Sequence, residues 1–249
     1  MTSIDSSKPI SRAAPCIADG VLLIDKPLGC TSFDVIRKLR RVCGFKKIGH
    51  AGTLDPFATG LLVILLGKAT RCSQSLMCGR KTYEGTVRLG VETSTYDREG
   101  EVVSNASVDG LTDDAIQAIL KTFLGDQYQD PPMFSAKKIN GVPLYKLARK
   151  GQTVERVPNF ITIFQCELLR YAAPDAIVKV CCSKGTYIRS LAHDLGKKLG
   201  VGGHLLELRR LQSGNFSVEQ AVPLQAILDE PNVWRSHLIP YDALLTPLN

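Results

Sequence analysis

A glycine-rich segment that runs directly into an uninterrupted apolar stretch constrains this chain more than any other feature of its sequence. The segment is Gly49-His50-Ala51-Gly52-Thr53-Leu54-Asp55-Pro56, and the apolar stretch is Leu61-Leu62-Val63-Ile64-Leu65-Leu66. A run of this length predicts a buried strand, although periodicity alone leaves a short buried helix open. Glycines permit close backbone approaches, and Pro56 steers Asp55 away from the helical conformation. We therefore expect Asp55 on a loop beside a buried strand.

Asp55 is also the only carboxylate between Val35 and Tyr83. Cations crowd the same span, namely Arg37, Lys38, Arg40, Arg41, Lys46, Lys47, Lys68, Arg71, Arg80 and Lys81. Positive surroundings favour the ionised form of a carboxyl group and attract polyanions. The alternative interpretation is an Asp-Pro turn in which the carboxylate accepts a hydrogen bond from its own backbone.

Charge and cysteine usage narrow the class of protein. The chain has 249 residues, enough for one large or two small domains. Its net charge of +7 indicates nucleic acid or another anionic partner, with a merely basic solvated surface as the alternative. The eight cysteines form no C-x-x-C pair and no metal-site spacing with the four histidines, so we expect no metal site. No cofactor is expected either. Scattered cysteines without a signal peptide predict free thiols in the cytoplasm, and no apolar run is long enough to span a membrane.

Strand-like and helix-like segments alternate along the chain, which predicts a mixed α+β sheet protein. Residues 1–19 are expected to be a disordered leader. A helix over 33–42, capped by Thr31 or Ser32, carries a basic face, and residues 131–151 form a long basic excursion. Strands are expected at 20–27, 81–89, 101–103, 159–170, 176–182 and 204–211, and helices at 68–77, 112–124, 144–150, 186–199 and 224–228.

The segment GHAGTLDPFATGLL, from Gly49 to Leu62, resembles the signature loop of the bacterial tRNA pseudouridine-55 synthases, the TruB family, to which dyskerin-type enzymes are related. Five other blocks follow the order of that family. They are Leu23-Ile24-Asp25-Lys26-Pro27 with Thr31-Ser32, Lys81-Thr82-Tyr83, Pro131-Pro132 with Ser135-Ala136-Lys137-Lys138 and Gly141, Lys184-Gly185-Thr186-Tyr187-Ile188-Arg189, and Gly203-His204-Leu205 with Leu208-Arg209-Arg210. Short motifs often match by chance, but six in order rarely do. The resemblance implies the pseudouridine synthase fold, a mixed and mainly antiparallel central sheet flanked by helices and loops, in a single catalytic domain over 20–249.

The resemblance also implies a reaction, in which uridine 55 in the T-loop of tRNA is flipped out and isomerised to pseudouridine. Asp55 matches the catalytic aspartate, a nucleophile towards C6 of the base or C1′ of the ribose, and the sequence leaves both targets open. Tyr83 matches a tyrosine that stacks on the uracil and assists proton removal from C5. Arg189 matches an arginine that pairs with the aspartate. Ordinary alternatives are a packed strand tyrosine for Tyr83 and a surface arginine for Arg189.

Several further positions match binding residues of the family. His50 and Tyr187 match residues at the flipped base, and Leu208 matches an apolar lining position. Residues 131–151 match an RNA-gripping thumb loop. Phosphate contacts are expected from Lys26, Arg71, Lys137, Lys138, Lys146 and Arg149, with solvated charge as the alternative for each. His193, His204 and His237 are expected to be structural.

Longer family members carry a carboxy-terminal PUA domain, and because the sequence ends at Asn249 we expect this domain to be missing here. We expect a monomer that acts on the T-arm of tRNA without an obligatory protein partner. One alternative is a tRNA-folding chaperone that performs no chemistry. An aspartyl-nucleophile phosphatase is a weaker alternative, since the D-x-D arrangement and magnesium-binding acids near Asp55 are missing.

Overall fold

The computed structural model of the protein describes residues 16–135, 137–139, 141–148, 151–152 and 154–244. The described chain divides into two compact units, and the expectation of a single catalytic domain over 20–249 stays a prediction. The first unit comprises Met1–Cys78 and Arg210–Asn249, and the second comprises Gly79–Arg209. Strand β12 (Gly203–Ser213) passes from the second unit into the first.

The first unit is built on two long antiparallel strands, β1 (Gly20–Lys26) and β3 (Ala58–Leu66). Their register runs from Gly20 opposite Leu66 to Lys26 opposite Gly60. Shorter strands extend this pair: β2 (Ile48–His50) and β15 (Leu238–Pro240) are antiparallel to it, and β14 (Val222–Pro223) is parallel to β1. The hairpin partner of the end of β12 is β13 (Phe216–Ser217).

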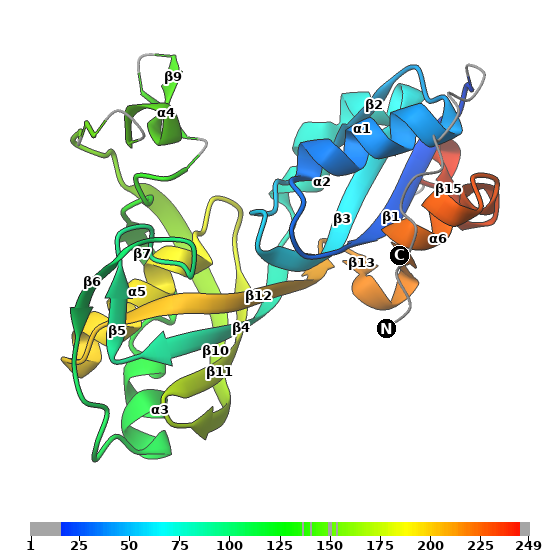
Figure 1. Ribbon diagram of the computed structural model, residues 1–249. Coiled ribbons are helices and arrows are strands. Elements are labelled where there is room, and N and C mark those ends of the chain that lie inside the picture. The colour runs from blue at the N-terminus through cyan, green and yellow to red at the C-terminus, as the bar shows by residue number, and fades with distance from the viewer. Residues whose placement is uncertain (1–15, 136, 140, 149–150, 153, 245–249) are drawn as a thin grey trace, which may run out of the picture. The chain divides into compact units, whose positions relative to one another are not determined.

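Helix α1 (Ser32–Cys43) covers one face of the β1–β3 pair (Figure 1). Thr31 begins it with a capping box, in which the Thr31 hydroxyl accepts from the Asp34 N–H and the Asp34 carboxylate accepts from the Thr31 N–H. Gly44, with φ of 72°, ends the helix in the left-handed conformation. The apolar residues Val35, Ile36, Leu39, Val42 and Cys43 recur at helical spacing and are all buried.

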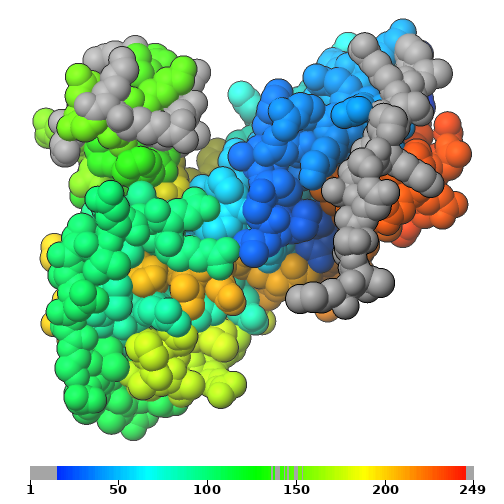
Figure 2. Space-filling model, in the orientation of Figure 1, coloured from blue at the N-terminus to red at the C-terminus, as the bar shows by residue number. Residues whose placement is uncertain are grey.

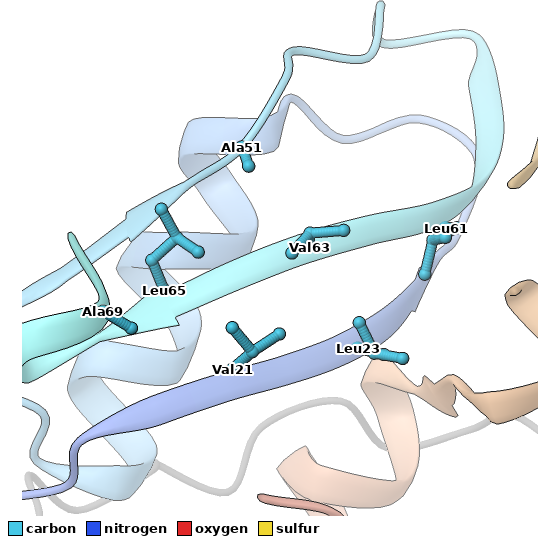
Figure 3. Packing of buried hydrophobic residues seen from close by; sticks show 7 residues of the cluster. All are labelled: Val21, Leu23, Ala51, Leu61, Val63, Leu65 and Ala69. Atoms are coloured by element: carbon cyan, nitrogen blue, oxygen red, sulfur yellow. The ribbon is translucent and has the colours of Figure 1, made fainter. Parts of the chain in front are cut away.

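The opposite face of the two strands carries a compact apolar cluster (Figure 3). Because side chains alternate along a strand, the odd-numbered residues of β1 and β3 share this face, and α1 lies behind the strands in Figure 3. Cover on both faces explains why eight of the nine residues of β3 are buried. The cluster comprises Val21, Leu23, Ala51, Leu61, Val63, Leu65 and Ala69.

Short helices complete the first unit. They are η1 (Gly67–Cys72), α2 (Ser73–Cys78), η2 (Val218–Gln220), α6 (Leu224–Asp229), η3 (Val233–His237) and η4 (Tyr241–Leu244). Part of the expected leader is packed against this unit. The Cys16 N–H donates to Gly44 O at 2.7 Å, and the Asp19 carboxylate accepts from the Lys68 N–H at 2.7 Å. Residues 1–15 of that leader lie outside the described chain.

The second unit holds an antiparallel sheet with the strand order β12-β4-β11-β10-β7. Its long strands are β4 (Lys81–Leu89), β10 (Asn159–Ala172) and β11 (Asp175–Cys182), and β7 (Gly125–Gln129) lies at the end of this order. Helix α3 (Asp113–Lys121) packs on β10, and helix α5 (Ile188–Leu199) packs on β4 and α3. Two small hairpins are β5 (Val91–Thr93) with β6 (Val102–Asn105), and β8 (Lys138–Ile139) with β9 (Val142–Pro143), the latter leading into α4 (Leu144–Ala148).

The predicted fold class is confirmed, since the protein is mixed α+β with a mainly antiparallel sheet flanked by helices. The interpretation of Leu61–Leu66 as a buried strand is also confirmed. Helix α5 begins at Ile188, two residues later than expected, because Gly185 has a φ of 81° and Tyr187 is extended. Strand β7 was missed because Asp126, Gln127 and Gln129 are polar and most of the strand is exposed.

Candidate functional site

Hydrogen bonds hold the two residues that flank Asp55 in its loop, Leu54 before it and Pro56 after it. On one side, the Ser32 hydroxyl accepts from the Leu54 N–H at 2.9 Å and lies 3.2 Å from Leu54 O. On the other side, Pro56 O accepts from the Gly29 N–H at 3.0 Å. The Asp55 carbonyl accepts from the Ala58 N–H at 3.1 Å, and Asp55 itself is half-buried. The backbone on both sides of Asp55 is therefore anchored.

Lys26 provides a buried cation beneath this loop. Its side chain is fully buried, and Nζ donates to Cys30 O at 2.6 Å, to Pro27 O at 3.0 Å and to Pro56 O at 3.4 Å. Burial lowers the pKa of Lys26, while the charge of Asp55 is among the influences that oppose this shift. The predicted phosphate contact of Lys26 is corrected here, because an ammonium enclosed by backbone carbonyls organises the loop and is not presented to solvent.

Arg210 braces the glycine-rich part of the loop from a strand 149 residues away from Leu61 in sequence. It is 1% exposed, and its Nε donates to Leu61 O at 2.7 Å while Nη2 donates to Gly52 O at 3.1 Å. Gly52 has a φ of 98°, and a Cβ there would lie 3.3 Å from Arg210 Nη1, so both the turn and the close approach favour glycine. The sequence placed Arg210 in a motif without giving it a role.

His50 lies at the end of β2, opposite Ile64 of β3. The residue is half-buried, and burial, followed by the nearby Arg210 charge, lowers the pKa of its imidazole. A lowered pKa favours the neutral ring at neutral pH, which can both donate and accept hydrogen bonds.

In the second unit, Arg189 is in the first turn of α5 and forms a buried ion pair with Asp97. Arg189 Nη1 lies 3.3 Å from Asp97 Oδ2, and the two residues are 5% and 4% exposed. The other Asp97 oxygen accepts from Thr95 Oγ1 at 2.6 Å and from the Glu99 N–H at 3.0 Å. The carboxylate thus orients the guanidinium from a loop that is itself cross-linked. Asp97 was not among the predicted site residues, since nothing near it in the sequence distinguishes it from a turn aspartate.

The start of α5 is anchored by the neighbouring strand β7. The Gln129 side chain, 6% exposed, accepts from the Tyr187 N–H at 2.8 Å and donates to Tyr187 O at 3.0 Å. One turn further on, Ser190 Oγ donates to Asp130 O at 2.8 Å. These bonds hold the backbone of Tyr187 and the base of the helix that carries Arg189.

Tyr83 and Leu208 belong to the strands β4 and β12 of the same unit. They are 9% and 8% exposed. Tyr83 shares a strand face with Gly85, where a Cβ would lie 3.7 Å from Leu208 Cδ1 and 3.2 Å from Leu205 Cδ1. Glycine at position 85 therefore allows the leucines of β12 to pack closely beside the Tyr83 face.

The predicted site residues are shared between the units. Asp55 and His50 are in the first, and Tyr83, Tyr187, Arg189 and Leu208 are in the second. The pairing of Arg189 with Asp55 stays a prediction. Among the expected phosphate contacts, Arg71 and Lys146 are exposed, whereas Lys137 donates to Val157 O and to Asn159 Oδ1. Arg149 lies outside the described residues, as does the side chain of Lys138.

In the described part of the chain, no group of three or more His, Cys, Asp or Glu side chains is arranged to hold a metal ion. All eight cysteines are free thiols. Across the same residues, no helix combines the length and the apolar character needed to cross a membrane.

Two protein-family models match the chain. Residues 40–188 match the N-terminal domain of the TruB family pseudouridylate synthases, and residues 189–249 match the C-terminal domain of tRNA pseudouridylate synthase B. Among individual relatives, tRNA pseudouridine synthase B of Opitutus terrae is 53% identical over 209 residues, which cover 84% of this chain and 87% of the relative. The protein of the same name from Ralstonia pickettii is 49% identical over 234 residues, covering 92% of this chain and 73% of the relative.

Solved structures with a similar fold include Cbf5 complexes. The crystal structure of a Cbf5-Nop10-Gar1 complex contains a chain with a TM-score of 0.72 and 29% identity, over 96% of this chain and 68% of that one. In the archaeal box H/ACA sRNP Nop10-Cbf5 complex the TM-score is 0.65 and the identity 30%, over 88% of this chain. In that second comparison the match spans 56% of the length of the solved chain.

Proposed function

Because the chain belongs to the TruB family of pseudouridylate synthases, we propose that it isomerises uridine to pseudouridine at position 55, in the T-loop of tRNA. Membership of the family makes the chain an enzyme of the pseudouridine synthase class. Relatives named tRNA pseudouridine synthase B support tRNA as the substrate. The position within the tRNA rests on the resemblance of the loop around Asp55 to the signature of the family.

We propose that Asp55 is the nucleophile. In the reaction the bond from N1 of uracil to C1′ breaks, the base turns, and a bond from C5 to C1′ forms. C5 loses its hydrogen as a proton, and N1 gains a proton, so the product is an isomer of the substrate. A single ionised carboxylate meets this requirement by adding to C6 or to C1′ and leaving again. Glycoside hydrolysis, by contrast, usually needs a pair of carboxylates.

The observation that carries this assignment is the anchoring of both neighbours of Asp55. Ser32 holds Leu54 through two contacts, and Lys26 and Gly29 both donate to Pro56 O. A nucleophile gains most of its advantage from being held in a reactive geometry before the substrate arrives. An ordinary Asp-Pro turn does not require such anchoring. Here the buried Ser32 holds Leu54, and two donors, Lys26 Nζ and the Gly29 N–H, hold the Pro56 carbonyl.

The second unit supplies the other proposed roles. Arg189 orients and stabilises the Asp55 carboxylate, and Asp97 acts as a positioning residue that aligns the guanidinium. The ring of Tyr83 stacks on the uracil, and its hydroxyl assists removal of the C5 proton. Tyr187 and Leu208 line the base pocket. From the first unit, His50 contacts the T-loop at the space left by the base.

Uridine 55 must leave the base stack to expose its C5, C6 and glycosidic bond, so the reaction requires base flipping. The net charge of +7 supports binding to the phosphate backbone. Of the expected phosphate contacts whose side chains the structure describes, Arg71 and Lys146 are exposed and so accessible to phosphate. Residues 131–151 are proposed to grip the T-arm.

Release of tritium from uridine labelled at C5 tests the proposal directly, because the C5 hydrogen is lost only when the base is rejoined through C5. Unmodified tRNA carrying the label is incubated with the wild-type protein and with Asp55→Asn. We expect release by the wild type and none above background by Asp55→Asn. Asp229→Asn, which changes an exposed aspartate of the same unit, is the matched control and should release tritium at the wild-type rate.

A tRNA in which uridine 55 is replaced by cytidine shows whether the labelled position is the one modified. Continued release from this tRNA would overturn the assignment to position 55. Tight tRNA binding without release, equal in the wild type and Asp55→Asn, would favour the alternative of an RNA chaperone.

A further inference from the structure

The outward face of helix α1 is a strongly basic surface of the first unit that the catalytic proposal does not use. Its exposed cations are Arg37, Lys38, Arg40 and Arg41, and the turn after the helix adds the exposed Lys46 and Lys47. In this stretch of the chain, from Ser32 to Lys47, the one acid is Asp34. We call this set, together with Phe33, the α1 basic surface.

The packing of α1 settles which way these side chains point. Val35, Ile36, Leu39, Val42 and Cys43 form a buried stripe, so the residues between them in the helical repeat must face outward. The α1 segment, drawn in blue, forms a continuous part of the visible surface of the first unit in Figure 2. A solvated helix face needs some charge for solubility, but mixed signs are usual on such a face, and here cations dominate.

Within the surface, Asp34 and Arg37 largely neutralise each other. Arg37 Nη2 lies 2.6 Å from Asp34 Oδ1, and the other Asp34 oxygen takes part in the capping box. The Asp34 carboxylate therefore caps the start of the helix and pairs with Arg37. The other exposed cations of the helix are Lys38, Arg40 and Arg41, and Lys46 and Lys47 follow them in the next turn.

Neighbouring elements add both signs of charge at the far end of the helix. Arg235 of η3 is exposed and stacks on the Trp234 ring at 4.7 Å, and Trp234 contacts Phe45 edge-on at 4.9 Å. Asp229 and Glu230, at the end of α6, are exposed acids near this end. These acids limit the basic surface at the end of α1. The exposed cations are densest along the middle of the helix, at positions 37 to 41.

The other end of α1 is tied to the Asp55 loop. Ser32, the first residue of the helix, is bonded to both the N–H and the carbonyl of Leu54. At a rise of about 1.5 Å per residue, the 12 residues of α1 extend about 18 Å from that junction. Phe33, 63% exposed, stands at the same end and offers an aromatic face. The cations therefore follow a line that starts beside the proposed nucleophile.

We propose that the α1 basic surface is a second RNA-binding surface, which contacts the phosphate backbone of the same tRNA beyond the flipped nucleotide. Cations spaced along a rigid helix suit a run of phosphates, because each contact releases condensed counterions and adds affinity without reading sequence. An exposed aromatic ring at the loop end suits stacking on a base. The inference rests on the proposed function, since it assumes a tRNA substrate at Asp55.

The test removes three charges at once with Lys38→Gln, Arg40→Gln and Arg41→Gln in the full chain. Binding of unmodified tRNA is measured over a range of salt concentrations. Each phosphate contact contributes about 0.7–0.9 to the slope of log K against log salt. We expect the slope to fall by about 2 and the affinity in 0.1 M salt to fall roughly tenfold or more. Phe33→Ala should weaken binding about fivefold or more and leave the slope unchanged.

A matched control removes the same charge from exposed positions of the second unit, with Lys121→Gln, Arg170→Gln and Lys197→Gln. The slope should stay close to that of the wild type in this control. An equal loss in both triple variants would mean that only net charge matters, and an unchanged slope in the α1 variant would mean that the surface does not touch RNA. Either result overturns the inference.

Tritium release in the same samples separates this inference from the proposed function. A wild type that binds tRNA but releases no tritium fails the proposed function, whatever the slopes show. An α1 variant that releases tritium at the wild-type rate with saturating tRNA, and yet binds weakly, supports a binding surface separate from the chemistry. Thermal unfolding confirms that the variants remain folded.

Discussion

Replacing Lys26 by Met tests whether the buried ammonium holds the Asp55 loop. Methionine keeps an unbranched side chain of similar length, so the change removes the donor without opening a large cavity. Three carbonyls lose a donor, those of Cys30, Pro27 and Pro56. Pro56 O keeps the Gly29 N–H as a donor at 3.0 Å, and Pro27 O keeps only the weak Cys30 thiol donor, at 3.6 Å. The carbonyls of Cys30 and Pro27 are therefore the groups most affected.

The size of the effect follows from those two carbonyls. A buried polar group left without its partner costs about 1–3 kcal/mol, so two give roughly 2–6 kcal/mol. Removing a buried charge recovers part of this, since burial already disfavours the charged form and lowers the pKa of Lys26. We expect a net loss of about 2–4 kcal/mol. For a chain of this size that corresponds to a fall in Tm of roughly 4–16 °C.

Thermal unfolding followed by circular dichroism measures this loss, and tritium release measures its effect on the reaction. The matched control is Lys38→Met, the same substitution at an exposed position of α1, which should change stability by less than about 0.5 kcal/mol. We expect Lys26→Met to slow isomerisation as well, because the backbone beside Asp55 loses an anchor. Equal Tm values for the two variants would refute the role assigned to Lys26.

Three further substitutions test a strained glycine, a buried ion pair and a buried carboxyl group. Gly52→Ala should destabilise the protein by about 1–3 kcal/mol and slow isomerisation, because φ at this position is 98° and the new Cβ would lie 3.3 Å from Arg210 Nη1; unchanged unfolding would contradict this. Asp97→Asn should cost about 1.5–3 kcal/mol and lower kcat more than it weakens tRNA binding, since it removes the charge that aligns Arg189; wild-type kinetics would dismiss Asp97 as a positioning residue. Burial raises the pKa of Asp194, so the folded protein holds the proton of this carboxyl group more tightly than the unfolded protein does. The contribution of Asp194 to stability therefore falls as the pH rises from the ordinary pKa of aspartate through the raised pKa of the folded state. Asp194→Asn should therefore raise the Tm near pH 7 and lose that advantage at pH 3; a variant less stable than the wild type at pH 7 would show that the carboxylate is favourable.

Local chemistry in the sequence was enough to predict the elements around the candidate nucleophile. The apolar run Leu61–Leu66 is a buried strand, because such a stretch has no polar face to turn towards water. The helix expected over 33–42 with a cap at Thr31 or Ser32 is α1, which Thr31 caps, because a capping side chain acts over a few residues. The loop position of Asp55 follows from glycines and a proline beside it. Each of these features depends on neighbours within about one helical turn.

Contacts between residues far apart in the chain could not be obtained in this way. Arg210 reaches Leu61 across 149 positions, and Arg189 meets Asp97 across 92. Lys26 belongs to a motif that was recognised in the sequence, but its complete burial was not predicted. Periodicity indicates which face of an element is apolar, and capping indicates where a helix begins or ends. The pairing of strands decides which distant side chains pack against that apolar face. A lysine or arginine is therefore indistinguishable from a surface cation until the sheet is assembled around it.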